Sequence, residues 1–322
     1  MKALVVQALS DDLSGVALCD TPAPVRRPGE LLVRVRAAAL NYPDLLMTRG
    51  AYQLKPEVPF TLGMEMAGEV IEADPDSGFA PGDWVVAGTR LGSFAEQVAV
   101  RADAVRPIPA GLDFAGAAAV GAAYLTAYVA IVRLGRMRPG EWVLVHGATG
   151  GVGLAAVDLA RALGGRVIAT SRSPDKLERL AAAYPVKAAL PASGFRDEVK
   201  RLTGGGADLV FDPVGGDLFD ESTRCIAFGG RLLVVGFTSG RIASVSTNLP
   251  LIRGFSVVGV RAGEYGRRFP DLGRENLDAV WRLAAEGRIT PRVHARYPLA
   301  DWRAAFEDMA ASRHIGKIVI EP

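Results

Sequence analysis

The segment from Glu141 to Lys176, EWVLVHGATGGVGLAAVDLARALGGRVIATSRSPDK, constrains the fold more than any other part of the sequence. It begins with a continuous apolar run, Trp142–Val145, which is typical of a buried parallel strand. A glycine-rich turn and an Ala- and Leu-rich helical stretch come next, followed by a second apolar run, Val167–Ala169. This order predicts a βαβ unit, and therefore a parallel sheet with helical crossovers.

The glycine-rich turn matches the pattern that binds a dinucleotide pyrophosphate, except that Ala148 replaces the first glycine. Gly150 lets the backbone approach the pyrophosphate, and Gly153 lets the helix pack closely on the sheet. The helix N-terminus adds unpaired N–H groups and the positive end of the dipole. An ordinary strand–helix turn is the alternative. We expect the whole turn to bind the cofactor: Ala148, Thr149, Gly150, Gly151, Val152 and Gly153.

The second strand of the unit ends without the carboxylate that NAD-binding proteins carry roughly 20 residues after the turn, where it bonds the ribose 2′-OH. The sequence has Ser171 and Arg172 at this point, with Lys176 one helical turn later. Both cations can pair with a 2′-phosphate, so NADPH is favoured over NADH. Asp175 is expected in the first turn of a helix, where it satisfies the dipole. For Arg172 and Lys176 the alternative is a role as solvated surface charges.

Composition limits the remaining possibilities. The chain has 322 residues, enough for two domains, and 49% of them are hydrophobic. A net charge of +2 argues against nucleic acid or an anionic membrane as the main partner. Cys19 and Cys225 are the two cysteines, so we expect no disulfide framework and a cytoplasmic location. We find no signal peptide and no apolar stretch of about 18 residues, and therefore expect no membrane span.

Residues 1 to about 120 have the pattern of a mostly β domain. Short strands are separated by Pro- and Gly-rich turns, and one of them alternates apolar and charged residues as a half-solvated strand does. This pattern favours a small, partly open barrel. The expected strands are Lys2–Gln7, Glu30–Ala37, Met66–Ala73, Asp83–Ala87 and Phe94–Val100.

After a helical stretch, Phe114–Leu134, strands and helices alternate for about 120 residues, which predicts a six-stranded doubly wound parallel sheet. The expected strands are Trp142–His146, Arg166–Thr170, Lys187–Leu190, Asp208–Asp212, Arg231–Gly236 and Phe255–Val260. The expected helices are Gly153–Leu163, Ser173–Ala183, Phe195–Leu202 and Leu218–Phe228. The tail has two helical stretches, Asn276–Glu286 and Asp301–Ala311, and a final strand, Lys317–Ile320. We expect the tail to pack on the first domain, because its strand has no place left in a six-stranded sheet.

Several segments together resemble the medium-chain dehydrogenase/reductase superfamily, and within it the zinc-free quinone oxidoreductases related to zeta-crystallin. The segments are Asn41–Asp44, Arg49–Tyr52, Pro59–Gly68, Leu125–Tyr128, the glycine turn, Phe211–Gly216 and His314–Lys317. The resemblance implies a GroES-like catalytic domain at 1–120, an NADPH-binding Rossmann domain at 121–262, and a C-terminal return to the catalytic domain at 263–322. It implies NADPH-dependent reduction of quinones or α,β-unsaturated carbonyls by hydride transfer.

The residues argue against a metal. Zinc-dependent members would need a thiolate near Asn41, a histidine just before Glu65 and a cluster of four cysteines. Tyr42-Pro43-Asp44 and Met64 stand at the first two places, and no cysteine cluster exists. The three histidines, His146, His294 and His314, lack ligand spacing, and we expect His146 to be a packing residue.

The resemblance points to Asn41 and Tyr52 as the polar groups that polarise the substrate. Tyr52 also falls where related enoyl thioester reductases place a proton-donating tyrosine. A loop aromatic is the alternative for Tyr52, and a turn residue for Asn41. Asp44 is expected to anchor the loop, and Lys317 to be a solvated strand residue.

On the cofactor side, the resemblance places Thr126 beside the nicotinamide ribose and phosphates. It also places the backbone of Val214, Gly236, Phe237 and Val258 around the nicotinamide, at the carboxyl ends of strands. An Asn-Tyr-Arg segment that the family often has near the adenosine is replaced here by Pro191-Ala192-Ser193. No adenine pocket is therefore assigned.

The same resemblance suggests how the chain assembles, and two alternative functions remain. An apolar edge strand at Phe255–Val260 favours pairing with a second chain, and relatives form homodimers through this edge. An enoyl thioester reductase would need a basic rim for its carrier, for which Arg261, Arg267 and Arg268 are candidates. A third hypothesis is an NADPH-binding structural or RNA-binding protein, which the near-neutral charge does not support.

Overall fold

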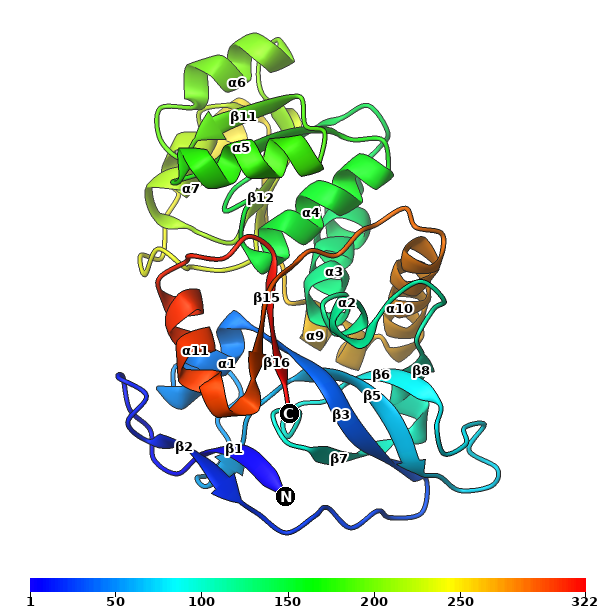
Figure 1. Ribbon diagram of the computed structural model, residues 1–322. Helices are drawn as coiled ribbons and strands as arrows, with labels where there is room; N and C mark the ends of the chain where they lie inside the picture. Colours follow the sequence, from blue (N-terminus) through cyan, green and yellow to red (C-terminus); the bar gives the residue numbers. More distant parts are fainter. The chain divides into compact units, whose positions relative to one another are not determined.

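The computed structural model describes residues 1–322, which divide into two compact units (Figure 1). Unit 1 comprises Met1–Ala122 and Pro291–Pro322, and unit 2 comprises Ala123–Thr290. The first boundary lies two positions after the expected one. Residues 263–290, which we expected in the C-terminal return, belong to unit 2, so the return begins at Pro291.

Unit 2 contains the predicted six-stranded parallel sheet, in the order β11-β10-β9-β12-β13-β14. The strands are β9 (Trp142–Val145), β10 (Arg166–Ser171), β11 (Ala188–Pro191), β12 (Ala207–Asp212), β13 (Ile226–Val234) and β14 (Ser256–Gly259). The chain winds outward from β9 in one direction through β10 and β11, and then in the other from β12. In such sheets, ligands bind at the carboxyl ends of the strands where the winding direction reverses, which here is between β9 and β12.

The helices of unit 2 confirm the alternation of strand and helix, with one correction. Besides those in the stretch Phe114–Leu134, they are α4 (Gly151–Ala162), α5 (Pro174–Ala183), α6 (Arg196–Thr203), α7 (Gly216–Ser222), α8 (Asn248–Arg253), α9 (Ala262–Arg268) and α10 (Pro270–Ala285). The helix predicted at Leu218–Phe228 is wrong beyond Ser222, because Ile226 already begins β13. Ile226 is buried and pairs with Ala207 of β12, so contact with a distant strand overrides the local helical pattern.

The helical stretch Phe114–Leu134 corrects a second expectation. It consists of α2 (Phe114–Ala118), α3 (Gly121–Tyr128) and a π-helical segment, Val129–Leu134. By length and composition it is long and apolar enough to cross a membrane, contrary to our expectation that no such stretch exists. Arg133 is its one charged residue. Since 61% of its most apolar window is buried inside the structure, its apolar character matches that of a core helix.

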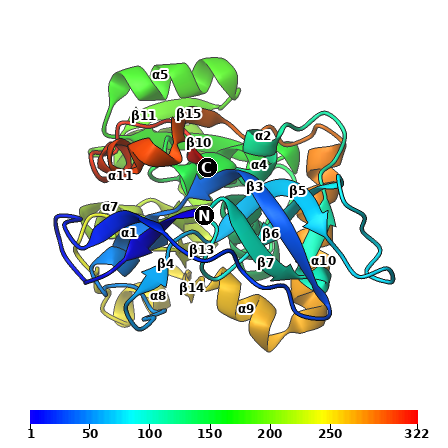
Figure 2. The ribbon, with the colours of Figure 1, turned by 60° about the horizontal axis from the view of Figure 1, so that its bottom comes forward.

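Unit 1 is mostly β, as predicted, and consists of two sheets (Figure 2). A three-stranded sheet has the order β2-β1-β4, and a seven-stranded sheet has the order β15-β16-β3-β5-β6-β8, with β7 paired to β3. The strands are β1 (Lys2–Val6), β2 (Val16–Asp20), β3 (Glu30–Leu40), β4 (Phe60–Thr61), β5 (Glu65–Glu72), β6 (Trp84–Gly88), β7 (Gln97–Arg101), β8 (Val105–Pro107), β15 (Val293–Pro298) and β16 (Lys317–Glu321).

The return of the C-terminal strand to the first domain is confirmed. Strand β16 pairs antiparallel with β3, with Ile318 opposite Leu40. Helix α11 (Trp302–Ala310) packs into the same core, where Phe306 meets Phe94 edge to face at 6.2 Å between ring centroids. The last 32 residues therefore complete the core of unit 1 rather than extend the parallel sheet.

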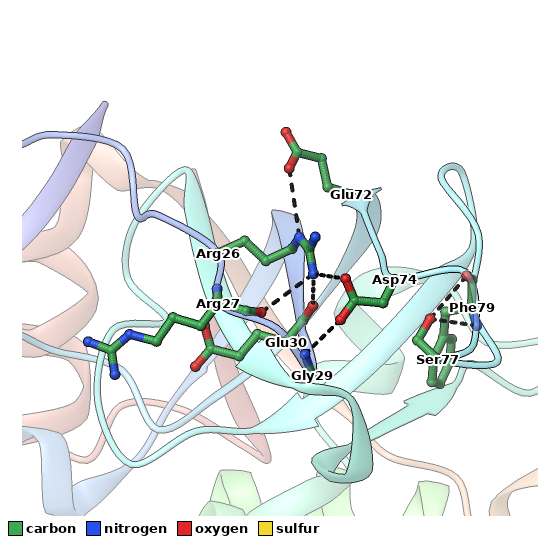
Figure 3. Close-up of polar contacts among 8 residues, drawn as sticks. All are labelled: Arg26, Arg27, Gly29, Glu30, Glu72, Asp74, Ser77 and Phe79. Carbon is green, nitrogen blue, oxygen red and sulfur yellow. Dashed lines mark hydrogen bonds and ion pairs between the residues drawn. The ribbon is translucent and has the colours of Figure 1, made fainter.

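The Pro-rich loop before β3 is held at the far end of β5 by Asp74 (Figure 3). Asp74 Oδ1 accepts a 2.5 Å hydrogen bond from Arg26 Nη1, and Oδ2 accepts one of 2.6 Å from the backbone of Gly29. Gly29 has φ +81°, a left-handed conformation that favours glycine. These bonds, first that from Gly29 and then that from Arg26, hold the pKa of Asp74 below its ordinary value.

Candidate functional site

The glycine turn opens helix α4 without a side-chain cap. Gly150 is the N-cap residue and has no side chain with which to bond the first-turn N–H groups. The turn is tied to the neighbouring strands by backbone bonds, from His146 to Phe211 O at 3.0 Å and from Ala148 to Thr170 O at 3.0 Å. An uncapped helix N-terminus at the carboxyl end of β9 is suited to a phosphate anion.

Gly153 permits the helix to pack closely against the backbone of the turn. A Cβ at this position would lie 2.1 Å from Gly147 O and 2.7 Å from Gly147 C. A Cβ on Gly150 would meet only Gly147 O, at 3.4 Å, which is an ordinary contact. Gly153 is therefore needed for packing, whereas the missing side chain at Gly150 leaves space in front of the turn.

The end of β10 brings together the hydroxyls and cations predicted for the cofactor. Thr149 Oγ1 and Ser171 Oγ are 3.2 Å apart, and Ser173 Oγ caps α5 by accepting from the Lys176 backbone N–H at 3.4 Å. Lys176 is half-buried, and its pKa is lowered by burial and by the charge of Arg172. An anion placed between these two cations would relieve that repulsion. As predicted, Asp175 lies in the first turn of α5.

The residues expected around the nicotinamide lie at the carboxyl ends of β12, β13 and β14. Val214 follows β12, and its N–H donates to Asp212 Oδ1 at 2.8 Å. Gly236 and Phe237 follow β13, and Phe237 is 43% exposed. Val258 lies within β14 and is half-buried.

Thr126, which the resemblance assigns to the cofactor, and Asp212 also belong to unit 2. Thr126 lies half-buried in α3. Asp212 was not singled out from the sequence. Its second carboxylate oxygen is buried without a hydrogen-bond partner, and burial raises its pKa.

His146 is a buried structural residue, in agreement with the packing role expected for it. Its Nδ1 lies 2.8 Å from Thr170 Oγ1 and its Nε2 lies 2.7 Å from Ser222 Oγ. Burial lowers its pKa to about 3, so the ring is neutral at physiological pH. It links β9, β10 and α7 from inside the protein.

In unit 1, Asn41 is the N-cap residue of a helix that was not among the expected elements. Helix α1 spans Tyr42–Thr48, and the backbone N–H of Asn41 donates to Asp44 Oδ2 at 2.8 Å. Asp44 therefore anchors this segment, as expected. It is fully buried, and burial raises its pKa to about 7.

The half-buried side chain of Asn41 forms a polar cluster with the buried residues Glu65 and Lys317. Asn41 Nδ2 donates to Ala39 O at 3.1 Å and to Glu65 Oε1 at 2.9 Å. Asn41 Oδ1 accepts from Lys317 Nζ at 2.7 Å. Glu65 Oε2 accepts from the backbone of Ala122 at 2.6 Å.

Lys317 corrects our expectation of a solvated strand residue. Only 5% of it is exposed, and its Nζ lies 3.0 Å from Glu65 Oε1. Burial is possible because β16 pairs with β3, which places the ammonium beside a carboxylate of opposite charge. The signals in the sequence were Glu65 in an otherwise apolar segment and Lys317 at the start of an apolar strand.

Tyr52 lies after α1 and packs half-buried against the hydrophobic core of unit 1. Its hydroxyl makes no hydrogen bond within the chain, in contrast to the Asn41 amide. No group of three or more His, Cys, Asp or Glu side chains is arranged to hold a metal ion. Met64 is half-buried at the position where a zinc-ligating histidine was considered.

Two family models and a curated relative cover most of the chain. Residues 27–110 match the family model described as the alcohol dehydrogenase GroES-like domain, and residues 151–283 match that described as zinc-binding dehydrogenase. The chain is 35% identical to quinone oxidoreductase-like protein 2 of Mus musculus over 304 residues, which cover 93% of this chain and 86% of that protein.

Two solved structures are similar over the whole chain. A probable oxidoreductase from Mycobacterium abscessus has a TM-score of 0.91 at 40% identity, with 100% of this chain and 99% of that chain covered. The quinone oxidoreductase of Thermus thermophilus, solved with and without NADPH, has a TM-score of 0.88 at 35% identity, with 100% of both chains covered.

Proposed function

The chain belongs to the quinone oxidoreductase family of medium-chain dehydrogenases/reductases, and we propose that it reduces quinones or α,β-unsaturated carbonyls by zinc-independent hydride transfer from NADPH. It is an oxidoreductase that uses a nicotinamide cofactor. The observation that carries the proposal is the strand end at Ser171–Lys176, where two cations stand in place of a carboxylate. The cofactor, when bound, supplies the hydride.

The choice of NADPH is supported by Arg172 and Lys176. An adenosine 2′-phosphate would accept charge-assisted hydrogen bonds from both side chains. Thr149 and Ser171 add hydroxyl groups beside them. Arg172→Ala is expected to raise the dissociation constant of NADPH at least about tenfold, for the loss of roughly 1.4 kcal/mol or more. Arg179→Ala, on the exposed side of α5, is the matched control and should change it less than twofold.

Zinc independence is supported by the residues around Asn41 and Glu65. Met64 and Tyr42 supply no ligand in place of the histidine and thiolate. The ammonium of Lys317, 3.0 Å from Glu65, neutralises the Glu65 carboxylate and would repel a divalent cation. Activity is therefore expected to be unchanged after dialysis against a chelator and after addition of zinc.

Tyr52 is our candidate proton donor. When a hydride adds to the electrophilic carbon of the acceptor, negative charge develops on the carbonyl oxygen or the enolate. A hydroxyl with no partner within the chain is available to donate a proton to that charge, and the tyrosinate regains its proton from solvent. The Tyr52 hydroxyl has no partner within the chain, whereas both amide hydrogens of Asn41 are bonded within it.

The test is NADPH oxidation followed across quinones, enones and enoyl-CoA thioesters. We expect turnover with at least one quinone or enone, and a fall of about 10²-fold or more in kcat for Tyr52→Phe. Reduction of the thioesters alone would assign the enoyl thioester reductase function instead. The enzyme proposal fails if no acceptor is reduced, and the proton-donor role fails if Tyr52→Phe equals the parent.

We also propose that the chain forms a homodimer through the edge of its parallel sheet. Strand β14 is the edge strand, and Val257 on it is 39% exposed. Phe228, Leu251 and Ile252 are exposed by 89%, 81% and 73%, and Gly254, at the end of α8, lies against the Phe228 ring. An apolar patch beside a bare edge strand is typical of a surface that a second chain covers.

A further inference from the structure

The ammonium of Lys317 has its hydrogen-bonding capacity filled. An ammonium has three donors, and Lys317 Nζ meets three acceptors: Asn41 Oδ1 at 2.7 Å, Glu65 Oε1 at 3.0 Å and Leu40 O at 3.0 Å. The side chains of Lys317 and Glu65 are 6% and 3% exposed, so neither charge is solvated by bulk water. Such a pair is held by its partners and has little freedom to move.

This arrangement permits one orientation of the Asn41 amide. With Nδ2 toward Glu65 and Oδ1 toward Lys317, every contact joins a donor to an acceptor. Turning the amide over would place its NH₂ against the ammonium and its oxygen against the carboxylate, and both contacts would be repulsive. Both N–H donors are used, since the second one bonds Ala39 O.

We propose that Lys317 is a positioning residue for the reductase site, which acts with Glu65 to hold the Asn41 amide in this orientation. The inference deepens the proposed function and rests on it for the catalytic consequence. With both amide hydrogens committed, Asn41 retains only its oxygen for contact with a substrate. Asn41 can therefore orient a substrate through that oxygen, while polarisation of the substrate carbonyl is left to the hydroxyl of Tyr52.

Amide hydrogen exchange tests the orientation without reference to activity. The Asn41 Nδ2 resonances are assigned in ¹⁵N spectra by their absence from Asn41→Ala, and their exchange with water is measured. Lys317→Met should speed that exchange at least about tenfold, whereas Lys2→Met, which removes an exposed lysine of the same unit, should leave it unchanged. If Lys317→Met does not fold, Lys317→Gln keeps a neutral donor and should still speed exchange. Unchanged exchange in a folded Lys317 variant overturns the proposal.

A double-mutant cycle on quinone reduction tests the catalytic consequence. Asn41→Ala and Lys317→Met should each lower kcat/KM at least about tenfold, and the double variant should lie within about twofold of Asn41→Ala. The dissociation constant of NADPH should stay within about twofold throughout. If the kcat/KM losses of the two single variants multiply in the double variant, Lys317 does not act through Asn41 and the positioning role is overturned. A parent that reduces no acceptor refutes the proposed function, while the exchange result still decides the orientation.

Discussion

The hydroxyl of Tyr124 donates a 2.8 Å hydrogen bond to Asp158 Oδ2, and both side chains are buried. The same oxygen accepts from the backbone of Thr290 at 2.6 Å, and Oδ1 accepts from Arg161 at 3.2 Å. Asp158 lies on α4, behind the glycine turn, and Thr290 is the last residue of unit 2. The Asp158 carboxylate on α4 thus hydrogen-bonds to residues near both ends of unit 2.

Removal of the Tyr124 hydroxyl is predicted to destabilise unit 2. Tyr124→Phe should lower the free energy of unfolding by about 1–2 kcal/mol, because the carboxylate keeps its other two partners. Asp158→Asn should cost about 3 kcal/mol or more, because Arg161 loses its counter-ion and the donors lose a charged acceptor. Denaturant unfolding measures both. Tyr128→Phe is the control on α3, the helix that also carries Tyr124. It removes no hydrogen bond within the chain, so its free energy of unfolding should stay within about 0.5 kcal/mol of the parent's.

Alanine substitutions at Gly150 and Gly153 of the turn are predicted to have different effects. Gly153→Ala should lower stability and NADPH affinity together, because its Cβ would lie 2.1 Å from Gly147 O and must push α4 away. Gly150→Ala should fold with nearly unchanged stability, since its contact is 3.4 Å, but should bind NADPH at least about tenfold more weakly. Melting temperature and cofactor titration separate the two outcomes. Equal loss of stability in both would contradict the packing role assigned to Gly153 alone.

Asp44 is predicted to make unit 1 less stable as the pH rises. Its pKa is about 7 in the folded protein and ordinary, 3.8, in the unfolded chain, so the folded state binds more protons between these values. Stability contributed by the protonated form is therefore lost from about pH 4 to pH 7, by at most about 1.4 kcal/mol per pH unit. Hydrogen exchange of β3 and β5 amides, corrected for intrinsic rates, measures it. Asp44→Asn should flatten that slope, and an unchanged slope would show that Asp44 is ionised when folded.

His146 is predicted to act in the opposite direction in unit 2. Its pKa is about 3 when folded and 6.5 in the unfolded chain, so unfolding takes up a proton between these values. Unit 2 should therefore lose stability as the pH falls below about 6.5, by up to about 1.4 kcal/mol per unit. Exchange of β9 and β12 amides reports on this unit. His146→Leu should abolish the slope, and Thr170 and Ser222 remain bonded to backbone carbonyls in that variant.

The edge strand is predicted to determine the oligomeric state. The parent should elute at twice the 34.0 kDa chain mass at about 10 μM, by light scattering after gel filtration. Val257→Lys places a charge on the exposed face of β14 and should shift the protein toward monomer. Val25→Lys, at an exposed position of unit 1, is the control and should leave the mass unchanged. A parent that is monomeric at this concentration would refute the dimer.

Local pattern determined much of this protein. The apolar run Trp142–Val145, the glycine turn and the helix after it predicted β9, the turn and α4, because each is specified by residues adjacent in the chain. The position of Arg172 and Lys176 at a strand end was predicted in the same way, because that strand belongs to the same βαβ unit. Even the return of Lys317–Ile320 to the first domain followed from the number of strands.

What only the tertiary structure decided is the state of side chains whose partners are distant. Ile226 is a strand residue rather than a helical one because it pairs with Ala207. Lys317 is buried rather than solvated because Glu65, 252 positions earlier, lies beside it, and that pair in turn fixes the amide of Asn41. Residue type shows how polar a side chain is, and periodicity shows on which face of a helix or strand it lies. The cost of burying a charge depends on the group that faces it, which the fold alone supplies.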